Sequence, residues 1–255
     1  MNNDLIKYLQ WLKNDFIKFL NDAQTNNVIL GISGGIDSTL TLAILNDLKK
    51  EYDLNIYAYF LDIHNSSLDY ECINELKNIY PNIEVINLVD IYDSYCKMIN
   101  KKTNDKYVLY NLKPKIRTNY LYAMANAYKG VVVSNLNYDE YILGFFTKYG
   151  DSAADYYMLI GLLKKHIYEL GAYYHLPNKI LNRAPTPANE DDEHKTDESF
   201  FGFTYNDLDQ FLLYRKINPK IVSMIKKRYE TNAHKHFVFD KKKLFLNYKL
   251  GNKHE

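Results

Sequence analysis

Several residue types are scarce in this sequence, and each shortage excludes a class of protein. The 255 residues include two cysteines, Cys72 and Cys96, whose spacing fits neither a metal motif nor a disulfide framework, so we expect a reduced, cytoplasmic protein. No apolar run reaches the roughly 18 residues of a membrane-spanning helix, and the N-terminus does not have the pattern of a signal peptide. Neither charge dominates, because 32 basic residues face 31 acidic ones. This balance gives no electrostatic reason to expect nucleic acid as the main partner.

Alternating strand and helix patterns predict a single α/β domain over residues 1–255. Apolar residues make up 47% of the chain, enough for a sizeable core. Short apolar runs predict strands at residues 28–32, 54–61, 83–88 and 131–134. Apolar residues at helical spacing predict helices at residues 4–24, 40–50, 67–79, 91–101, 113–128, 162–174, 205–213 and 219–229. This order is typical of a doubly wound parallel sheet flanked by helices.

Polar segments follow three of the expected strands, at residues 31–39, 62–67 and 134–140. In a doubly wound sheet the ligand crevice lies outside the carboxyl ends of the strands. The three segments would therefore meet at one edge of the sheet, where we expect the functional site. Residues 101–108 are expected to form a loop, which leaves Pro114 in the first turn of the next helix, where proline is tolerated.

The segment at residues 28–42 has the pattern of a strand, a glycine-rich turn and a helix start. Adjacent glycines let the chain turn tightly and approach a ligand closely. The free N–H groups and the dipole of the following helix favour an anion. The segment therefore predicts a phosphate-binding cradle. Its residues are Gly31, Ile32, Ser33, Gly34, Gly35, Ile36, Asp37 and Ser38.

Asp37 indicates what kind of phosphate site this is. No Gly-Lys-Ser/Thr follows the turn, so the cradle is not of the Walker type. A carboxylate inside a phosphate site repels the ligand unless a divalent cation lies between them, so Asp37 predicts bound Mg²⁺. The alternative is an ordinary strand–helix turn in which Asp37 caps the helix.

The motif SGGIDS resembles the SGGxDS signature of the ATP pyrophosphatases, or PP-loop enzymes, which have a Rossmann-like, adenine nucleotide alpha hydrolase-like fold. From about residue 5 to about residue 240, the chain is similar to the ammonia-dependent NAD synthetases. Four blocks carry this resemblance, namely GISGGIDST, NLKPKIRTNYLYA, GFFTKYGDSAAD and the pair His234–Lys235. The block from Gly144 to Asp155 is the most specific of the four.

The resemblance implies a ligase of NAD biosynthesis that joins ammonia to the carboxylate of deamido-NAD (nicotinic acid adenine dinucleotide). ATP would first adenylate the carboxylate and release pyrophosphate. Ammonia would then attack the acyl adenylate and release AMP. Because no residue forms a covalent intermediate, the protein's tasks are positioning and charge neutralisation.

The resemblance also implies roles for individual residues. ATP would be bound by the cradle together with Asn135, Lys164 and Thr186. Mg²⁺ would be held by Asp37 and by Glu140, which would otherwise be interpreted as an exposed acid at a helix start. The deamido-NAD contacts would be Lys115, Arg117, Lys148, Asp155, His234 and Lys235. Without the resemblance, these six residues have plainer interpretations as solvated side chains, turn residues or tail residues.

The chain departs from the family pattern at four places, one of which is a mild change of glycines to Ser-Ala-Ala at residues 152–154. Lys115 stands where the family usually has arginine, which keeps the charge but not the bidentate fork. Asn135 replaces a threonine and can still donate and accept hydrogen bonds. The loop at residues 61–64 lacks the usual Leu-Pro. None of these changes removes the cradle or the magnesium carboxylates, so we expect an active enzyme.

Four further expectations complete the prediction. Residues 187–199 are charged and poor in apolar anchors, so we expect a mobile loop there, and residues 230–255 are expected to form a tail. The resemblance implies a homodimer, with the helix at 113–128 as a candidate interface. Only about 27 residues precede the first strand, which leaves no room for a glutaminase domain there. We therefore expect free ammonia, or ammonia from a separate protein, as the nitrogen source.

Two other functions remain open from the sequence. The first is another PP-loop ATP pyrophosphatase, such as a tRNA-modifying or GMP synthetase-like enzyme. The near-zero net charge argues against a tRNA enzyme. The second is a catalytically inactive nucleotide-binding protein. Asp37 and Glu140 argue against it, because binding alone does not need both carboxylates.

Overall fold

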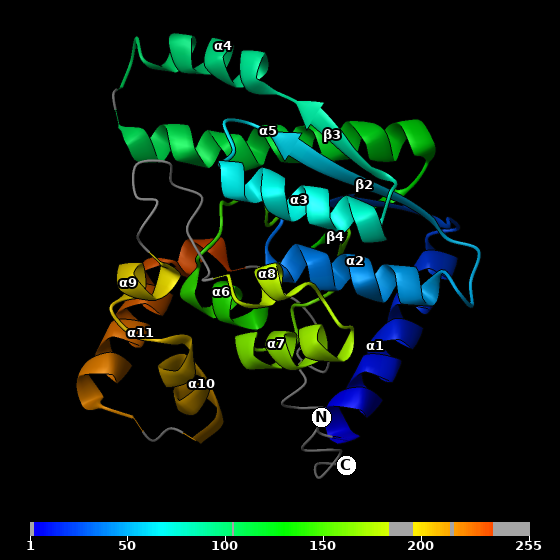
Figure 1. Cartoon of the computed structure of the whole chain (residues 1–255). Helices are drawn as coiled ribbons and strands as arrows, with labels where there is room; N and C mark the ends of the chain where they lie inside the picture. Colours follow the sequence, from blue (N-terminus) through cyan, green and yellow to red (C-terminus); the bar gives the residue numbers. More distant parts are fainter. Residues whose placement is uncertain (1–2, 104, 184–195, 215–216, 237–255) are drawn as a thin grey trace.

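A parallel five-stranded sheet forms the centre of the molecule (Figure 1). The computed structural model describes residues 3–103, 105–183, 196–214 and 217–236. The strand order is β3-β2-β1-β4-β5, and every neighbouring pair is parallel. The strands are β1 (Asn27–Gly31), β2 (Asn55–Asp62), β3 (Ile83–Asn87), β4 (Val131–Ser134) and β5 (Tyr156–Tyr157). The predicted doubly wound sheet is confirmed. The strand β5 was not predicted, because two residues are too few to give a periodic pattern.

The direction of winding reverses between β1 and β4. The chain runs outward from β1 to β2 and β3, and then returns to place β4 on the other side of β1. Leu30 pairs with Val133, so the loops after β1 and β4 leave the sheet side by side. Such a switch point opens a crevice for a ligand at the carboxyl ends of the strands.

Helices cover both faces of the sheet and extend beyond its carboxyl edge (Figure 1). They are α1 (Asn3–Asp22), α2 (Ile36–Leu48), α3 (Ser67–Ile79), α4 (Val89–Ile99), α5 (Lys106–Tyr128), α6 (Tyr138–Leu143), α7 (Lys164–Tyr173), α8 (Asn178–Leu181), α9 (Asp197–Phe201), α10 (Tyr205–Tyr214) and α11 (Pro219–Thr231). A short 3₁₀ helix, Ala233–Lys235, follows α11.

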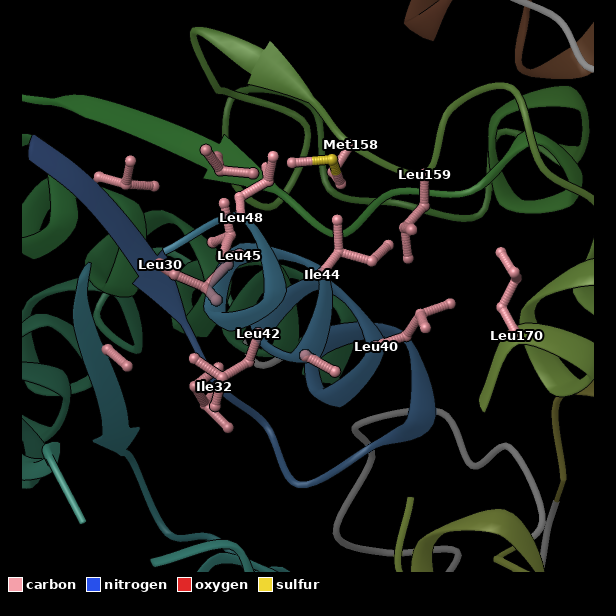
Figure 2. Close-up of a cluster of buried hydrophobic side chains, with 14 of the residues drawn as sticks. Leu30, Ile32, Leu40, Leu42, Ile44, Leu45, Leu48, Met158, Leu159 and Leu170 are labelled. Atoms are coloured by element: carbon pink, nitrogen blue, oxygen red, sulfur yellow. The ribbon is translucent and has the colours of Figure 1, made fainter. Parts of the chain in front are cut away.

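Alternate residues of the central strands enter two different hydrophobic cores. On one face, Leu30 and Val133 pack in a core with α1, α2, α3 and α7. On the other face, Ile29 and Val132 pack with α4 and α5. This alternation follows from the two-residue period of a strand that is buried on both sides. The helix α2 is buried nearly all round, because it lies between the sheet and α7 (Figure 2).

A third apolar cluster lies beyond the sheet and joins α6 to the last helices. Leu143 of α6 packs there with Phe201, Leu208 and Ile225, which come from α9, α10 and α11. In Figure 1, α9, α10 and α11 stand together at the lower left. The cluster therefore ties the C-terminal helices to the loop after β4.

The predicted start of α5 was wrong. The helix begins at Lys106 rather than at residue 113, after Asp105, whose side chain accepts a hydrogen bond from the N–H of Tyr107. Pro114 therefore lies inside the helix instead of in its first turn. Proline in a helix interior removes one backbone hydrogen bond. On sequence alone, Pro114 is therefore expected in the first turn of the helix, where no such bond is lost. The N-cap at Asp105 and the side chains of α5 that pack against the sheet outweigh that loss.

The last residues of the predicted mobile loop belong to a helix and its cap. Thr196 caps α9, which begins at Asp197, so residues 196–199 are helical or cap a helix. Residues 187–195 of that loop and Thr186 lie outside the described residues, as does the part of the predicted tail at 237–255. In the parts of the chain that the structure describes, no helix is long and apolar enough to cross a membrane.

Candidate active site

The glycine-rich turn after β1 is closed by its own hydroxyl groups. The N–H of Ser33 donates to Oγ of Ser38 at 3.2 Å, and that hydroxyl donates to the carbonyl of Gly35 at 3.1 Å. Thr39 also donates to the Gly35 carbonyl, at 2.9 Å. Gly34 has a φ of 82°, in the left-handed region that favours glycine. The turn is therefore held in one shape, at the end of the strand next to the switch point.

The helix that follows the turn has no side-chain cap. Gly35 is the N-cap of α2, so no capping side chain accepts a hydrogen bond from the N–H groups of the first turn, and the N–H of Gly35 itself donates to Oγ of Ser33 at 3.2 Å. Asp37, which the sequence allowed as a cap, instead accepts hydrogen bonds from Asn137 at 2.9 Å and from Lys164 at 2.7 Å. The first turn of α2 thus keeps the arrangement that binds an anion, with N–H groups at a positive helix end.

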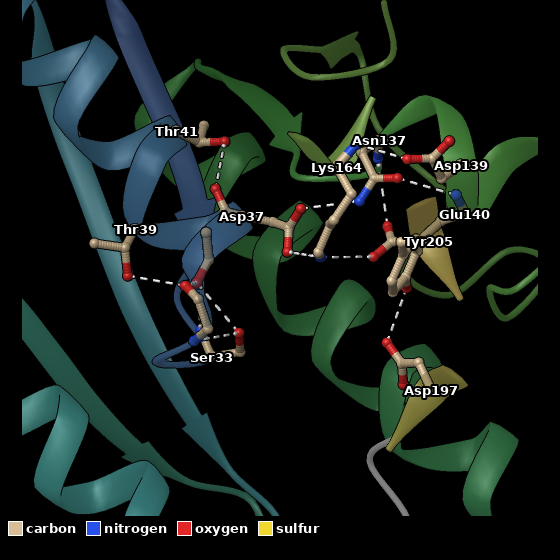
Figure 3. A network of polar contacts seen from close by, with 12 residues as sticks. Ser33, Asp37, Thr39, Thr41, Asn137, Asp139, Glu140, Lys164, Asp197 and Tyr205 are labelled. Carbon is tan, nitrogen blue, oxygen red and sulfur yellow. Dashed lines mark hydrogen bonds and ion pairs between the residues drawn. The ribbon is translucent and has the colours of Figure 1, made fainter. Parts of the chain in front are cut away.

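Lys164 lies between the two predicted metal carboxylates (Figure 3). Its Nζ is 2.7 Å from Oδ2 of Asp37 and 3.8 Å from Oε1 of Glu140. The side chain of Lys164 is 4% exposed, and those of its two partners are 18% and 19% exposed. Lys164 is therefore buried and does not lie on a solvated helix face.

Asn137 joins the two carboxylate loops and was not predicted as a site residue. Its Nδ2 donates to Asp37 at 2.9 Å, and its Oδ1 accepts from the N–H of Glu140 at 3.0 Å. Glu140 returns the contact, because its Oε2 accepts from the N–H of Asn137 at 3.3 Å. This capping box starts α6, and the Asn-x-x-Glu spacing would have been the signal for it.

The environment of the carboxylates opposes a second negative charge. Burial, and then the charge of Asp37, raises the pKa of Glu140 well above its usual value. Burial disfavours the ammonium of Lys164, but Asp37 and Glu140 more than compensate and raise the pKa of Lys164. Tyr205 places its ring over Lys164, with Nζ 5.5 Å from the ring centroid. A cation is therefore strongly favoured at the point between Asp37 and Glu140.

The donor set fits magnesium shared with a phosphate. Asp37 and Glu140 offer carboxylate oxygens, which this hard cation prefers. Within the described ranges, no group of three or more His, Cys, Asp or Glu side chains forms a metal cage. Mg²⁺ commonly binds through one or two carboxylates and completes its shell with water and substrate phosphates. A pair of carboxylates next to a phosphate cradle suits that mode of binding.

The loop after β4 reaches the cradle through Asn135. Its Nδ2 donates to the carbonyl of Gly31 at 2.9 Å. Its Oδ1 is buried and has no hydrogen-bond partner among the described residues. Buried polar atoms are normally paired, so this oxygen is available to a ligand donor. The geometry suits the predicted role of Asn135 at a nucleotide.

A surface pocket of about 410 Å³ brings together three residues predicted to contact the dinucleotide. Lys148 comes from the GFFTKYGD block, and His234 and Lys235 come from the 3₁₀ helix after α11. Nζ of Lys235 donates to the carbonyls of Gly144 and Phe146, at 2.8 and 2.9 Å. The C-terminal pair therefore packs against the most specific block of the sequence, nearly a hundred positions earlier in the chain.

The other predicted dinucleotide residues lie around these loops. Asp155 accepts from the N–H of Val132 at 2.7 Å and from the hydroxyl of Tyr122, a pocket residue, at 3.3 Å. Arg117 donates to the carbonyl of Leu61 in β2 and to Oδ1 of Asn65, both at 2.9 Å, and so braces the loop after β2. Lys115 is exposed on α5. The structure brings Lys148, His234 and Lys235 together in one pocket and does not include Lys115 or Arg117 among its lining residues.

The fold and the site together define a class. A doubly wound sheet with a glycine-rich phosphate cradle at its switch point, and two carboxylates beside it, is the arrangement of a nucleotide-binding α/β protein of the PP-loop type.

Comparison with known proteins narrows that class. The sequence profile described as "NAD synthase" matches residues 8–242. The NH(3)-dependent NAD(+) synthetase of Mycoplasma genitalium is 35% identical over 240 residues, which span 91% of this chain and 94% of that protein. The chain belongs to the NAD synthase family.

Solved structures agree with this assignment. The NMN synthetase from Francisella tularensis superposes with a TM-score of 0.85 and 28% sequence identity, over 92% of this chain and 97% of that one. The NH3-dependent NAD synthetase from Campylobacter jejuni, in complex with the nitrate ion, gives a TM-score of 0.72 at 24% identity, over 94% of this chain and 99% of that one. This second likeness concerns the fold.

Proposed function

We propose that the protein amidates deamido-NAD to NAD, with ATP and ammonia, through an acyl adenylate. One observation carries the proposal: in this member of the NAD synthase family, the glycine-rich cradle lies beside a carboxylate pair that already encloses a cation, Nζ of Lys164. A site that binds the negatively charged triphosphate of ATP needs positive charge to neutralise it. The family assignment supplies the acceptor, and the cradle supplies the place for ATP.

The residues of the cradle would act on the leaving group. N–H groups of the turn and the first turn of α2 would hold the pyrophosphate end of ATP, where charge develops as the α–β bond breaks. Asp37 and Glu140 would hold Mg²⁺, which neutralises phosphate charge when bound. Lys164 would remain close enough to reach a phosphate oxygen. These groups are fixed by packing and by Asn137, so little reorganisation accompanies the reaction.

The pocket lined by Lys148, His234 and Lys235 would receive the acceptor. Its lysines favour the anionic carboxylate and phosphates of deamido-NAD. Its four aromatic and imidazole neighbours, Tyr122, Tyr149, Tyr157 and His236, offer flat apolar surface to a pyridine ring. The acceptor carboxylate would then be directed toward the cradle from the β4 side of the switch point.

The test is NAD formation by the purified protein from ATP, Mg²⁺, ammonium and deamido-NAD. We expect NAD and AMP in equal amounts, and a far slower reaction when glutamine replaces ammonium. Equal rates with glutamine would refute the assignment of ammonia as the direct nitrogen source. No NAD with either nitrogen source would refute the proposed function.

A mononucleotide acceptor is the second candidate. The structure with a TM-score of 0.85 is described as an NMN synthetase, and the same chemistry on nicotinic acid mononucleotide would give NMN. The two candidates differ in kcat/KM for the two acceptors, measured side by side. A higher kcat/KM for deamido-NAD supports the first, and a higher value for the mononucleotide supports the second.

We further propose a homodimer that uses the face formed by α4 and its neighbours. Large apolar side chains are exposed there on β3, α4 and the start of α5, namely Val85, Ile91, Tyr95, Met98 and Tyr107. In Figure 1, α4 lies over the first half of α5, with no further helix drawn beyond it. Clusters of exposed apolar side chains mark interaction sites. The predicted interface at 113–128 is thereby extended to α4.

The dimer is tested by light scattering on Met98→Glu, with Ile79→Glu as the control. Ile79 is also exposed but lies at the end of α3, away from this face. Dissociation of the first variant and a dimeric control support the proposal. A monomeric wild-type protein, or a dimer unaffected by Met98→Glu, would count against it.

A further inference from the structure

Arg183 is a charged residue beside the cradle that neither the sequence motifs nor the proposed mechanism uses. It follows α8, and its Nη2 donates to Oδ1 of Asp69 on α3 at 2.6 Å. The side chains of Arg183 and Asp69 are 16% and 15% exposed. An ion pair with so little exposure fixes the plane of the guanidinium group.

Asp69 is itself held in place by the start of α3. Its Oδ2 accepts from the N–H of Ser66 at 2.9 Å, while its own N–H donates to the hydroxyl of Ser66 at 3.2 Å. One carboxylate oxygen therefore completes the capping box, and the other holds Arg183. Because the capping box fixes the carboxylate, the carboxylate can orient the arginine.

The guanidinium group is turned toward the bend of the cradle. A Cβ added to Gly34 would lie 3.7 Å from Nη1 of Arg183 and 3.3 Å from the carbonyl oxygen of Asp69. The same hypothetical atom would lie 3.1 Å from Cβ of Cys72. Gly34 thus packs directly against α3 and Arg183, and the arginine stands at the rim of the turn that would hold the pyrophosphate.

One edge of this guanidinium remains available for a ligand. Nη1 makes a weak hydrogen bond to Sγ of Cys72 at 3.9 Å. Among the described residues, no oxygen accepts a hydrogen bond from Nη1. Lys164, the cation on the other side of the cradle, is by contrast already engaged with Asp37 and Glu140. Arg183 shares its charge with Asp69 but still has Nη1 to offer to a ligand at Gly34.

We infer that Arg183, oriented by Asp69, binds the pyrophosphate end of ATP and holds it as the leaving group departs. The inference rests on the proposed function, because it takes the cradle as the triphosphate site. Arginine suits this task, since its fork gives two parallel hydrogen bonds to phosphate oxygens. AMP lacks the β- and γ-phosphates, so its binding does not involve Arg183.

The test compares pyrophosphate and AMP on the same variants. Isothermal titration calorimetry with magnesium pyrophosphate and with AMP needs no turnover, so it remains valid if the proposed reaction is wrong. Arg183→Gln is expected to weaken pyrophosphate binding about 10- to 100-fold, equivalent to about 1.4 to 2.8 kcal/mol. AMP binding is expected to stay within about threefold of wild type.

Two further variants separate charge, orientation and fold. Arg183→Lys keeps a point charge but loses the fork, so it should recover part of the pyrophosphate affinity. Lys179→Gln is the matched control, because the Lys179–Glu71 ion pair joins the same two helices, α8 and α3, on the exposed surface. This control should bind pyrophosphate like the wild type.

The outcomes are distinct from those of a structural role. Equal losses of pyrophosphate and AMP affinity in Arg183→Gln would mean that the arginine only braces the site, and would overturn the inference. Pyrophosphate binding within twofold of wild type would overturn it as well. If Arg183→Gln does not fold, Arg183→Lys decides the matter, because the inference requires a selective loss of pyrophosphate affinity there too.

Discussion

Replacing Lys164 by methionine tests the charge arrangement of the site most sharply. Methionine keeps the length of the side chain but removes the ammonium that lies 2.7 Å from Asp37 and 3.8 Å from Glu140. Two unit charges about 4 Å apart attract by about 4 kcal/mol at an effective dielectric constant of about 20. Deleting one partner of a buried pair typically costs about 3 to 5 kcal/mol, because the other charge stays buried and unpaired. We therefore expect Lys164→Met to lower the free energy of unfolding by about 3 kcal/mol or more in magnesium-free buffer.

The loss should depend on pH in a defined direction. Burial and Asp37 raise the pKa of Glu140 above its value in the unfolded chain. The folded state then binds more protons than the unfolded state, so stability falls as pH rises from about 4.5 through the raised pKa. In Lys164→Met, which has no ammonium here, the loss of stability with rising pH should be larger. Lys164→Met should thus be closest to wild type at low pH.

Magnesium should restore much of the stability of Lys164→Met, because a divalent cation can then occupy the space between the carboxylates. Urea unfolding with and without Mg²⁺ measures this effect. Lys13→Met is the matched control, since it breaks the Lys13–Asp47 pair near the C-terminal end of α2, whereas the site lies at its N-terminal end. The control should lose stability without responding to Mg²⁺. A Lys164→Met variant within about 1 kcal/mol of wild type, or one as indifferent to Mg²⁺ as the control, would refute the reasoning.

Four other substitutions follow from the same geometry. Asp37→Asn and Glu140→Gln should each lower turnover more than about tenfold at saturating Mg²⁺, roughly 1.4 kcal/mol of barrier, and a smaller effect in kinetic assays would contradict their assignment. Gly34→Ala forces a left-handed conformation that costs about 1 to 2 kcal/mol, and its Cβ would lie 3.1 Å from Cβ of Cys72, so both melting temperature and ATP affinity should fall. Lys235→Met removes the hydrogen bonds to Gly144 and Phe146, so it should raise KM for deamido-NAD with little change in kcat, and an unchanged KM would show that Lys235 is not needed there.

The sheet and the cradle were predictable because local patterns determine them. Short apolar runs mark the strands, and segments with apolar residues at helical spacing mark the helices between them. The motif SGGIDS at the end of the first strand marks the turn. Asp37 stood out in the sequence for an electrostatic reason, because a carboxylate in a turn predicted to bind phosphate requires a cation beside it. These inferences need no knowledge of which segments meet in space.

Other parts of the site depend on contacts that no local pattern encodes. Lys164 is buried because α7 packs against α2 and α10, and its sequence context alone did not distinguish it from an exposed lysine. Arg183 meets Asp69 across 114 positions of the chain. Lys235, in the 3₁₀ helix at Ala233–Lys235, donates hydrogen bonds to the carbonyls of Gly144 and Phe146, which follow α6. Such pairings follow from the assembled fold.

The central claim is that ATP activates the acceptor's carboxylate as an acyl adenylate. Deamido-NAD labelled with ¹⁸O in both carboxylate oxygens tests it directly, with ammonium as the nitrogen source and mass spectrometry of the products. The account predicts one ¹⁸O in AMP and one in the amide of NAD, with unlabelled pyrophosphate. Label in inorganic phosphate together with ADP, or AMP without label, would contradict it.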